Sequence, residues 1–393
     1  MLLRSGSGVG LGHILVPTTK NMGQRTPFGI SADLILVMMQ SYISSASRLM
    51  GGRATGVSIA SSHTRRMAAL VTTQTSLRTR ISSINRTRLF THHEYNTSAR
   101  IPDHSWDSHM HVVDPTKYPL APNALYTPPA HKLSQAMRFE STVNLRNVVL
   151  VQPSIYGNDN TCMLDALKQI GPARGRAVVA LDPSTITTQT LDQWHGMGVR
   201  GVRVNLKSVQ REISKAELER ELLLYANVIR PYGWVLQLFI GLEAVTWLEE
   251  IIPKLNIRVC FDHFGAPSIP EDFAKCPDPY TLPGFQSLVN LLRKGSTYVK
   301  LSAPYRFSKC SKQEDIEVLA QEILRVAGKT RVVYATDWPH TRFDNVDIKP
   351  FTRKCLEWCG DDRALVHQLF RGNAEDLWDA KPVTHERDEH RRA

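Results

Sequence analysis

The chain has 393 residues, of which 42% are hydrophobic, and its formal net charge is +11. This length suits one large domain with extensions, and the hydrophobic content allows a sizeable core. Residues 1–100 hold 12 basic and two acidic residues and so carry +10 of the charge, which leaves the remainder near neutral. We therefore expect no nucleic-acid-binding groove, and the apolar run Leu34–Met39 is too short to span a bilayer.

The first hundred residues do not predict a packed domain. They are rich in Ser, Thr, Arg and Gly, and their apolar residues lack sustained periodicity. An acid-poor, Arg- and Ser-rich segment is typical of a mitochondrial targeting sequence, and the stretch that begins at Met67 fits this description better than the stretch at Met1. We expect a disordered N-terminal extension over 1–100 and a mitochondrial location. A cytoplasmic location, and a translation start at either methionine, stay open.

From Trp106 onward, short apolar runs alternate with amphipathic segments. The runs predict strands at Trp106–His111, Val148–Gln152, Ala177–Ala180, Val199–Asn205, Val235–Phe239, Val259–His263, Thr297–Leu301 and Val332–Thr336. The clearest predicted helices are Leu191–Met197, Lys215–Arg230, Ala244–Lys254, Phe285–Lys294, Lys312–Ala327 and Arg363–Asp379. Eight strands with helical crossovers predict an α/β fold, a single (β/α)8 TIM barrel over 101–380, followed by a mobile charged tail over 381–393. A doubly wound open sheet is the alternative, and it explains less well why polar residues gather at so many strand ends.

Polar residues at three of these strand ends form a candidate catalytic site. His109 and His111 are two apart on the first strand, so both side chains face the barrel interior. His263 and Asp337 end the sixth and eighth strands, at the end of the barrel where active sites lie. Imidazoles suit metal ligation or charge relay, and a carboxylate suits general-base catalysis. A core histidine or a helix-capping aspartate would explain each feature alone, but their coincidence favours a site.

The segments that hold these residues resemble a known family. DSHMH, DHFG and YATDWPH, together with VQPSIYGNDN, GVRGVRVNL and VKLSAPYRFS, resemble the amidohydrolase-2 branch of the amidohydrolase superfamily, and most closely the 2-pyrone-4,6-dicarboxylate lactonase-like hydrolases. The resemblance spans about 101–378. It implies a hydrolase that opens a small carboxylated lactone, with Asp337 as the general base to water. It also implies that His263, supported by His109 and His111, polarises the carbonyl.

The resemblance implies substrate-binding residues as well. Arg203 and Arg306 are the candidates for holding substrate carboxylates, because a guanidinium binds a carboxylate with two parallel hydrogen bonds. Arg200 is three residues before Arg203 and would face the opposite side of the strand, so Arg203 is favoured. Ser154 and Tyr126 lie on segments that match substrate-contacting loops. Ser154 could equally well be a helix cap, and Tyr126 a packed loop aromatic.

Some positions depart from the metal-dependent pattern of the superfamily. The fifth strand ends at Phe239 where a histidine ligand is usual, and the fourth strand offers Asn205 and Lys207. We therefore expect no cofactor, in line with the lactonase branch. The alternative is a metallohydrolase or decarboxylase with one divalent ion such as Zn²⁺. The ion would be held by His109, His111, His263 and Asp337. A tyrosine is common near the Phe239 position in that branch, so the exact substrate stays open, as does a homo-oligomer.

Overall fold

The computed structural model describes residues 101–275 and 277–380, and every structural statement below refers to these. The predicted extension with its targeting segment, and the predicted tail, lie outside the described residues. In the part of the chain that is described, every helix is too short or too polar to span a bilayer.

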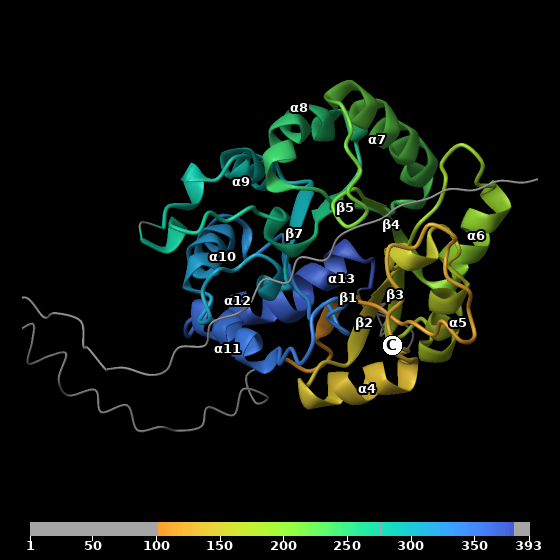
Figure 1. Cartoon of the computed structure of the whole chain (residues 1–393), viewed down its shortest axis with the longest axis horizontal. Helices are drawn as coiled ribbons and strands as arrows, with labels where there is room; N and C mark the ends of the chain where they lie inside the picture. Colours follow the sequence, from red (N-terminus) through yellow and green to blue (C-terminus); the bar gives the residue numbers. More distant parts are fainter. Residues whose placement is uncertain (1–100, 276, 381–393) are drawn as a thin grey trace, which may run out of the picture. The chain divides into compact units, whose positions relative to one another are not determined.

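The described residues form one barrel of eight parallel strands in chain order (Figure 1). The strands are β1 Trp106–Met110, β2 Asn147–Val151, β3 Gly175–Val179, β4 Val199–Asn205, β5 Val235–Phe239, β6 Val259–Phe261, β7 Thr297–Leu301 and β8 Val332–Tyr334. Met110 bridges to Trp338, and the amide of Asp337 donates to the carbonyl of His109, which joins the last strand to the first. The predicted single (β/α)8 barrel is confirmed.

Helices surround the sheet and alternate with its strands (Figure 1). The α-helices are α4 Leu133–Thr142, α5 Thr161–Ile170, α6 Thr188–Met197, α7 Lys215–Ile229, α8 Val245–Leu255, α9 Phe285–Lys294, α10 Glu314–Ala327, α11 Lys349–Trp358, α12 Arg363–His367 and α13 Asn373–Leu377. Short 3-10 helices are η1 Ser154–Tyr156, η2 Arg230–Tyr232, η3 Leu242–Ala244, η4 His263–Gly265, η5 Phe273–Lys275, η6 Pro279–Thr281 and η7 Pro304–Arg306; η8, Gln368–Gly372, is a π-helix. The predicted helix 363–379 is therefore interrupted by a π-helical segment and ends at Leu377.

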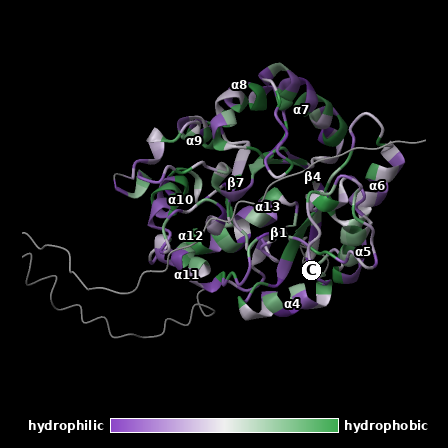
Figure 2. Ribbon diagram, viewed as in Figure 1, coloured by the Kyte–Doolittle hydropathy of each residue, from purple (hydrophilic) through white to green (hydrophobic). Residues whose placement is uncertain are grey.

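The helices are amphipathic, and their apolar sides face the sheet (Figure 2). In α9, Phe285, Leu288, Val289 and Leu292 recur at helical spacing and are fully buried. Gly284 precedes α9 with φ of 87°, and a Cβ atom there would lie 1.8 Å from the carbonyl oxygen of Leu242. Only glycine fits this close approach, so the sequence fixes how α9 packs against η3.

Strand β1 contains an extra residue. Asp107 lies opposite Val148 and Met110 lies opposite Leu150, so three steps along β1 cover two steps along β2. This bulge changes the alternation of side chains within the strand. Asp107 contacts the loop after β8, whereas His109 lies against Asp262 and Lys300, whose side chains are fully buried in the barrel.

Candidate active site

Four predicted residues from three strand ends converge on one point. Asp337 Oδ1 lies 3.6 Å from His109 Nε2, 3.7 Å from His111 Nε2 and 3.7 Å from His263 Nε2. The Nε2 atoms of His109 and His111 are 3.3 Å apart. All four side chains are buried. The sequence prediction that these residues meet at the carboxyl ends of the strands is correct in geometry.

Two of these residues lie just beyond their strands in an unusual backbone conformation. β6 ends at Phe261 and β8 at Tyr334, two residues earlier than predicted in each case. His263 has φ of 51° and Asp337 has φ of 62°. A residue with a side chain costs about 1 kcal/mol in this left-handed region, so neighbouring hydrogen bonds must hold it there. The amide of Asp337 donates to His109 O at 2.9 Å, and the carbonyl of His263 accepts from Ala266 at 2.7 Å.

The two carboxylate oxygens of Asp337 have different partners. Oδ2 accepts from Arg306 Nε at 2.9 Å and from the Tyr305 hydroxyl at 2.7 Å, and Arg306 Nη2 lies 2.7 Å away. Oδ1 is buried and makes no hydrogen bond within the described part of the chain. Burial favours the neutral acid, but the charge of Arg306 outweighs it and holds the pKa of Asp337 well below its usual range. Asp337 is therefore ionised at neutral pH, with one oxygen that is not hydrogen-bonded.

The imidazoles around this oxygen are neutral. Burial lowers the pKa of His111 and of His263 to about 4, and that of His109 well below its usual value. His111 Nδ1 lies 2.7 Å from the carbonyl of Val151, so this nitrogen carries the proton and Nε2 presents a lone pair to the site. His263 Nδ1 lies 2.7 Å from the hydroxyl of Ser302. If Ser302 donates, His263 Nε2 carries a proton toward the site.

A buried network of charged side chains contacts His109 Nδ1, the ring nitrogen that faces away from Asp337. Asp262 Oδ1 is 3.2 Å from His109 Nδ1 and 3.2 Å from Lys300 Nζ. Its Oδ2 accepts from Arg203 Nε and from Gln237 Nε2, both at 3.1 Å. Burial alone would raise the pKa of Asp262, but Lys300, His109 and Arg203 hold it well below its usual range. Asp262 thus orients His109, although it is next to His263 in sequence.

Lys300 and Asp107 are absent from the predicted site. Lys300 is the single charged residue within β7 (TYVKL) and is fully buried, so a lysine inside an apolar strand was the available signal. Asp107 accepts from the amides of His109 and Thr336 at 3.0 and 2.9 Å and also from the Thr336 hydroxyl. Burial raises the pKa of Asp107 to about 6, against these hydrogen bonds. Asp107 ties β1 to the loop after β8 through Thr336. The DSHMH motif alone does not predict this contact between distant segments.

The predicted substrate-binding residues line one cavity with three of the predicted catalytic residues, His111, His263 and Asp337. This catalytic cavity measures about 40 Å³. Its walls include His111, Tyr126, Ser154, Arg203, Phe239, His263, Arg306 and Asp337. Arg200 instead pairs with Asp379 at 3.1 Å, so it faces away from the cavity as predicted. The substrate contacts of Arg203, Arg306, Ser154 and Tyr126 stay predictions.

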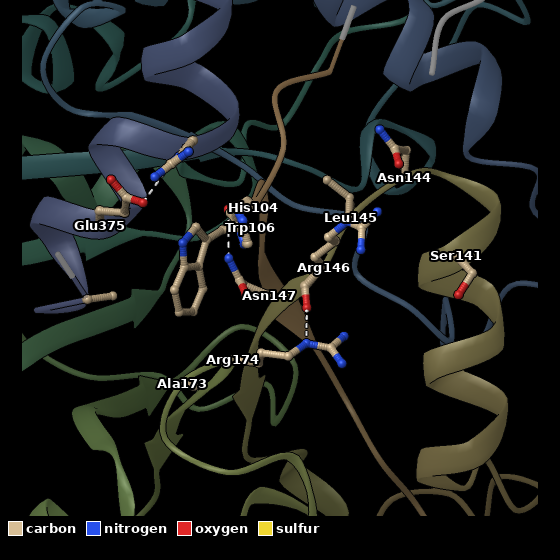
Figure 3. Close-up of a pocket in the computed structure, with 12 residues that line it drawn as sticks. His104, Trp106, Ser141, Asn144, Leu145, Arg146, Asn147, Ala173, Arg174 and Glu375 are labelled. Atoms are coloured by element: carbon tan, nitrogen blue, oxygen red, sulfur yellow. Dashed lines mark hydrogen bonds and ion pairs between the residues drawn. The ribbon is translucent and has the colours of Figure 1, made fainter. Parts of the chain in front are cut away.

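A larger cavity lies at the other end of the barrel. It measures about 680 Å³ and is lined by residues that precede or begin β1, β2 and β3, among them Trp106, Asn147 and Arg174 (Figure 3). The one carboxylate in its wall, that of Glu375, is paired with Arg371 at 2.7 Å. The lining also includes the imidazole of His104, but it has no cluster of imidazoles around an unbonded carboxylate oxygen like that at Asp337.

The donor set of the catalytic residues fits a divalent metal ion. Two overlapping groups have ligand atoms within 4.8 Å of one another. They are His109, His111 and Asp337, and His109, Asp262 and His263. The free Oδ1 of Asp337 and neutral imidazole nitrogens are ligand types that Zn²⁺ accepts. This arrangement fits the alternative expectation of one divalent ion, rather than the primary expectation of none.

Comparisons with known proteins agree with the motifs. The amidohydrolase family model (Amidohydro_2) matches residues 106–380. The chain is 32% identical over 255 residues to a 4-sulfomuconolactone hydrolase of Hydrogenophaga intermedia, covering 64% of this chain and 79% of that protein. It is 29% identical over 253 residues to a 2-pyrone-4,6-dicarboxylate hydrolase of Comamonas testosteroni, covering 61% and 78%. A crystal structure from Pseudomonas putida, described as a candidate 2-pyrone-4,6-dicarboxylic acid hydrolase, matches with a TM-score of 0.60 and 25% identity over 72% of this chain and all of that one.

Proposed function

Because the chain belongs to the amidohydrolase family, and is thus a hydrolase, we propose that it opens a carboxylated lactone with Asp337 as the general base. The membership confirms the family resemblance read from the motifs. Two relatives are named for the opening of a sulfomuconolactone and of a pyrone dicarboxylate, and these names support a lactone as the substrate. The observation that carries the assignment of the base is the ionised, otherwise unbonded Oδ1 of Asp337 among three imidazoles.

The proposed mechanism depends on two atoms that make no hydrogen bond through a proton of their own, His111 Nε2 and Asp337 Oδ1. The lone pair on His111 Nε2 accepts a hydrogen bond from water and orients it, and Asp337 Oδ1 removes the proton of the other O–H bond. The hydroxide adds to the lactone carbonyl, and the Nε2 proton of His263 stabilises the oxyanion. The acyl–oxygen bond of the ring then breaks, and the proton held by Asp337 passes to the leaving ring oxygen.

Arginines hold the substrate in this scheme. Arg203 and Arg306 both line the catalytic cavity, and each also pairs with a carboxylate of the site. A substrate carboxylate between them would position the ring and place its carbonyl near Asp337.

A divalent ion suits the same residues. His109, His111, His263 and Asp337 would hold it, and when bound it would polarise the carbonyl and acidify a water. Metal analysis of the purified chain, with and without chelator treatment, distinguishes the two forms of the proposal. Full lactonase activity in protein that holds less than a tenth of an equivalent of metal would exclude the metal-dependent form.

The full chain, assayed by pH-stat on a panel of carboxylated lactones, tests the proposal. Asp337→Asn is expected to lower kcat by about 1,000-fold, because the amide cannot accept the proton. Asp344→Asn, an exposed change in the same loop, serves as the matched control, and circular dichroism verifies the fold of both variants. Hydrolysis of no lactone by the wild-type chain, or full turnover by Asp337→Asn, would overturn the proposal.

A further inference from the structure

The wall of the catalytic cavity contains a further arginine, Arg342, which the sequence motifs do not single out. Arg342 lies in the loop between β8 and α11 and is exposed. By contrast, Arg203 is 8% exposed, and the side chain of Arg306 is 16% exposed. A residue that lines a cavity and is also exposed lies where the cavity opens to solvent. Arg342 is thus the outermost arginine of this wall.

Arg342 differs from the two inner arginines in its charge balance. Arg203 Nη2 lies 3.1 Å from Asp262 Oδ2, and Arg306 Nη2 lies 2.7 Å from Asp337 Oδ2. Each inner guanidinium is therefore partly neutralised by a carboxylate of the protein. Arg342 makes no ion pair with any carboxylate in the described part of the chain. An anionic ligand that enters the cavity meets a guanidinium whose charge is not yet balanced.

Uncharged groups hold the Arg342 guanidinium at the opening. Its Cζ lies 4.4 Å from the centre of the Tyr126 ring, which is a cation–π contact, and its Nη2 lies 3.5 Å from the carbonyl oxygen of Ser208. Tyr126 follows β1 and Ser208 follows β4, so these contacts join three of the loops at the carboxyl ends of the strands. Nε and Nη1 make no hydrogen bond with the described residues, so the guanidinium keeps N–H donors for a ligand.

The catalytic cavity is too small to enclose a whole carboxylated lactone. It measures about 40 Å³, which is room for only a few waters. A lactone whose carbonyl reaches Asp337 therefore extends beyond this volume, and any part that extends toward solvent passes Arg342. A carboxylate or a sulfonate on that side of the ring can accept hydrogen bonds from the Arg342 guanidinium, and the opposite charges strengthen these bonds.

We propose that Arg342 binds an anionic group, a carboxylate or a sulfonate, on the solvent side of the substrate, while Arg203 and Arg306 hold an inner carboxylate. The proposal rests on the proposed lactone hydrolysis and adds a specificity-determining residue to it. Arg342 selects lactones with two anionic groups over lactones with one, whereas the chemical step stays with Asp337.

Isothermal titration calorimetry of the full chain with three aromatic acids tests the proposal without the need for turnover. Isophthalate and 3-sulfobenzoate carry two anionic groups on a planar six-membered ring, and benzoate carries one. We expect Arg342→Gln to weaken the binding of at least one of the two dianions by about 10-fold or more, because charge-assisted hydrogen bonds are lost, and that of benzoate by less than about 2-fold. A loss for isophthalate alone identifies a carboxylate as the outer group, and a loss for 3-sulfobenzoate alone identifies a sulfonate.

Arg353→Gln, which removes an exposed arginine on α11, is the matched control and should bind all three acids as the wild type does. Equal weakening of benzoate and the dianions by Arg342→Gln would overturn the proposal. Unchanged binding of both dianions by this variant, or no binding of either dianion by the wild type, would overturn it as well.

Kinetics on lactones separates this proposal from the proposed function. Arg342→Gln should raise KM for a lactone with two anionic groups about 10-fold and leave kcat within about 2-fold, since Arg342 does not contact the reacting atoms. Arg342→Lys keeps the charge and should give a KM between these two. An equal fall in kcat/KM for lactones with one and with two anionic groups would show that Arg342 only packs on Tyr126. If the wild type hydrolyses no lactone, the proposed function fails, and the calorimetry still decides whether Arg342 binds anions.

Discussion

The two carboxylate oxygens of Asp337 differ in their contacts: Oδ2 is hydrogen-bonded, and Oδ1 is the oxygen proposed to react. Arg306 and Tyr305 occupy Oδ2, so the group cannot rotate without breaking these contacts. Oδ1 is left with three neutral imidazoles at 3.6–3.7 Å. In the proposed mechanism, the reactivity of Asp337 therefore depends on residues that do not contact the water, such as Tyr305.

Tyr305→Phe should slow the reaction while the fold stays intact. The variant loses the 2.7 Å hydrogen bond to Asp337 Oδ2, which favours the charged carboxylate. We expect kcat to fall by about 10-fold, and the acidic limb of the pH–rate profile to move to higher pH because the pKa of Asp337 rises. Tyr298→Phe, on β7, is the matched control. A fall in kcat with an unmoved acidic limb would contradict the proposed effect on Asp337.

The buried neutral His111 makes stability depend on pH. Its pKa is about 4 in the fold and about 6.5 in the unfolded chain, so the unfolded state binds more protons below pH 6.5. The stabilisation is complete above pH 6.5 and is lost as the pH falls toward 4. From pH 7.5 to pH 5, the wild type should lose about 2 kcal/mol more of its free energy of unfolding than His111→Gln. Urea titrations at both pH values measure the difference, and equal losses would show that His111 is not buried and neutral.

At the scale of elements, the fit between helices depends on a few backbone positions. Gly284, before α9, lies against the carbonyl of Leu242 in η3, and the approach leaves no room for a side chain. Gly295, after α9, has a similar φ of 102° but open space around it. The two glycines thus separate the effect of backbone conformation from that of crowding.

Gly284→Ala should destabilise the barrel far more than Gly295→Ala. Both variants are strained by the left-handed conformation, by about 1 kcal/mol. Only the first also forces Leu242 and Gly284 apart, because its Cβ would lie 1.8 Å from a carbonyl oxygen, so we expect a loss above about 3 kcal/mol. Thermal unfolding of both variants measures this, and equal melting temperatures would rule out the tight contact.

The sequence predicts some elements closely and others poorly for physical reasons. Apolar runs with sharp ends yield β4, β5, β7 and α9 with correct bounds. α4, α5 and α11 are not among the clearest predicted helices, although α5 and α11 each bury an apolar stripe at helical spacing. In the site, period-two alternation and strand ends predict the four converging residues. Asp262, Lys300 and Tyr305 act through contacts between distant segments, which no local pattern contains.

At the scale of the molecule, the two ends of the barrel differ in chemistry. The predicted catalytic residues lie at the carboxyl ends of the strands, whereas the cavity at the amino ends includes one ion pair, Arg371 with Glu375, in its wall. In barrels of this kind the first end carries activity and the second carries stability. The larger volume of the second cavity therefore does not indicate the active site.

Arg371→Ala should affect stability and leave catalysis unchanged. The variant loses the pair with Glu375 and a hydrogen bond from Nη1 to the carbonyl of Asp103 at 3.2 Å. We expect the free energy of unfolding to fall by about 1 kcal/mol, since the pair is partly exposed. kcat and KM should stay within about 2-fold of the wild-type values. A large change in kcat would contradict the division between the two ends.

The bulge in β1 has an evolutionary consequence. Since three steps of β1 match two of β2, the surplus residue lies between Asp107 and Met110, the segment that holds His109. Loss of one residue there would restore regular pairing with β2 and leave the count and order of strands intact, but it would move His109 relative to Asp262 and Lys300. Homologues shorter by one residue in this segment are therefore expected to keep the barrel and to hold this imidazole differently.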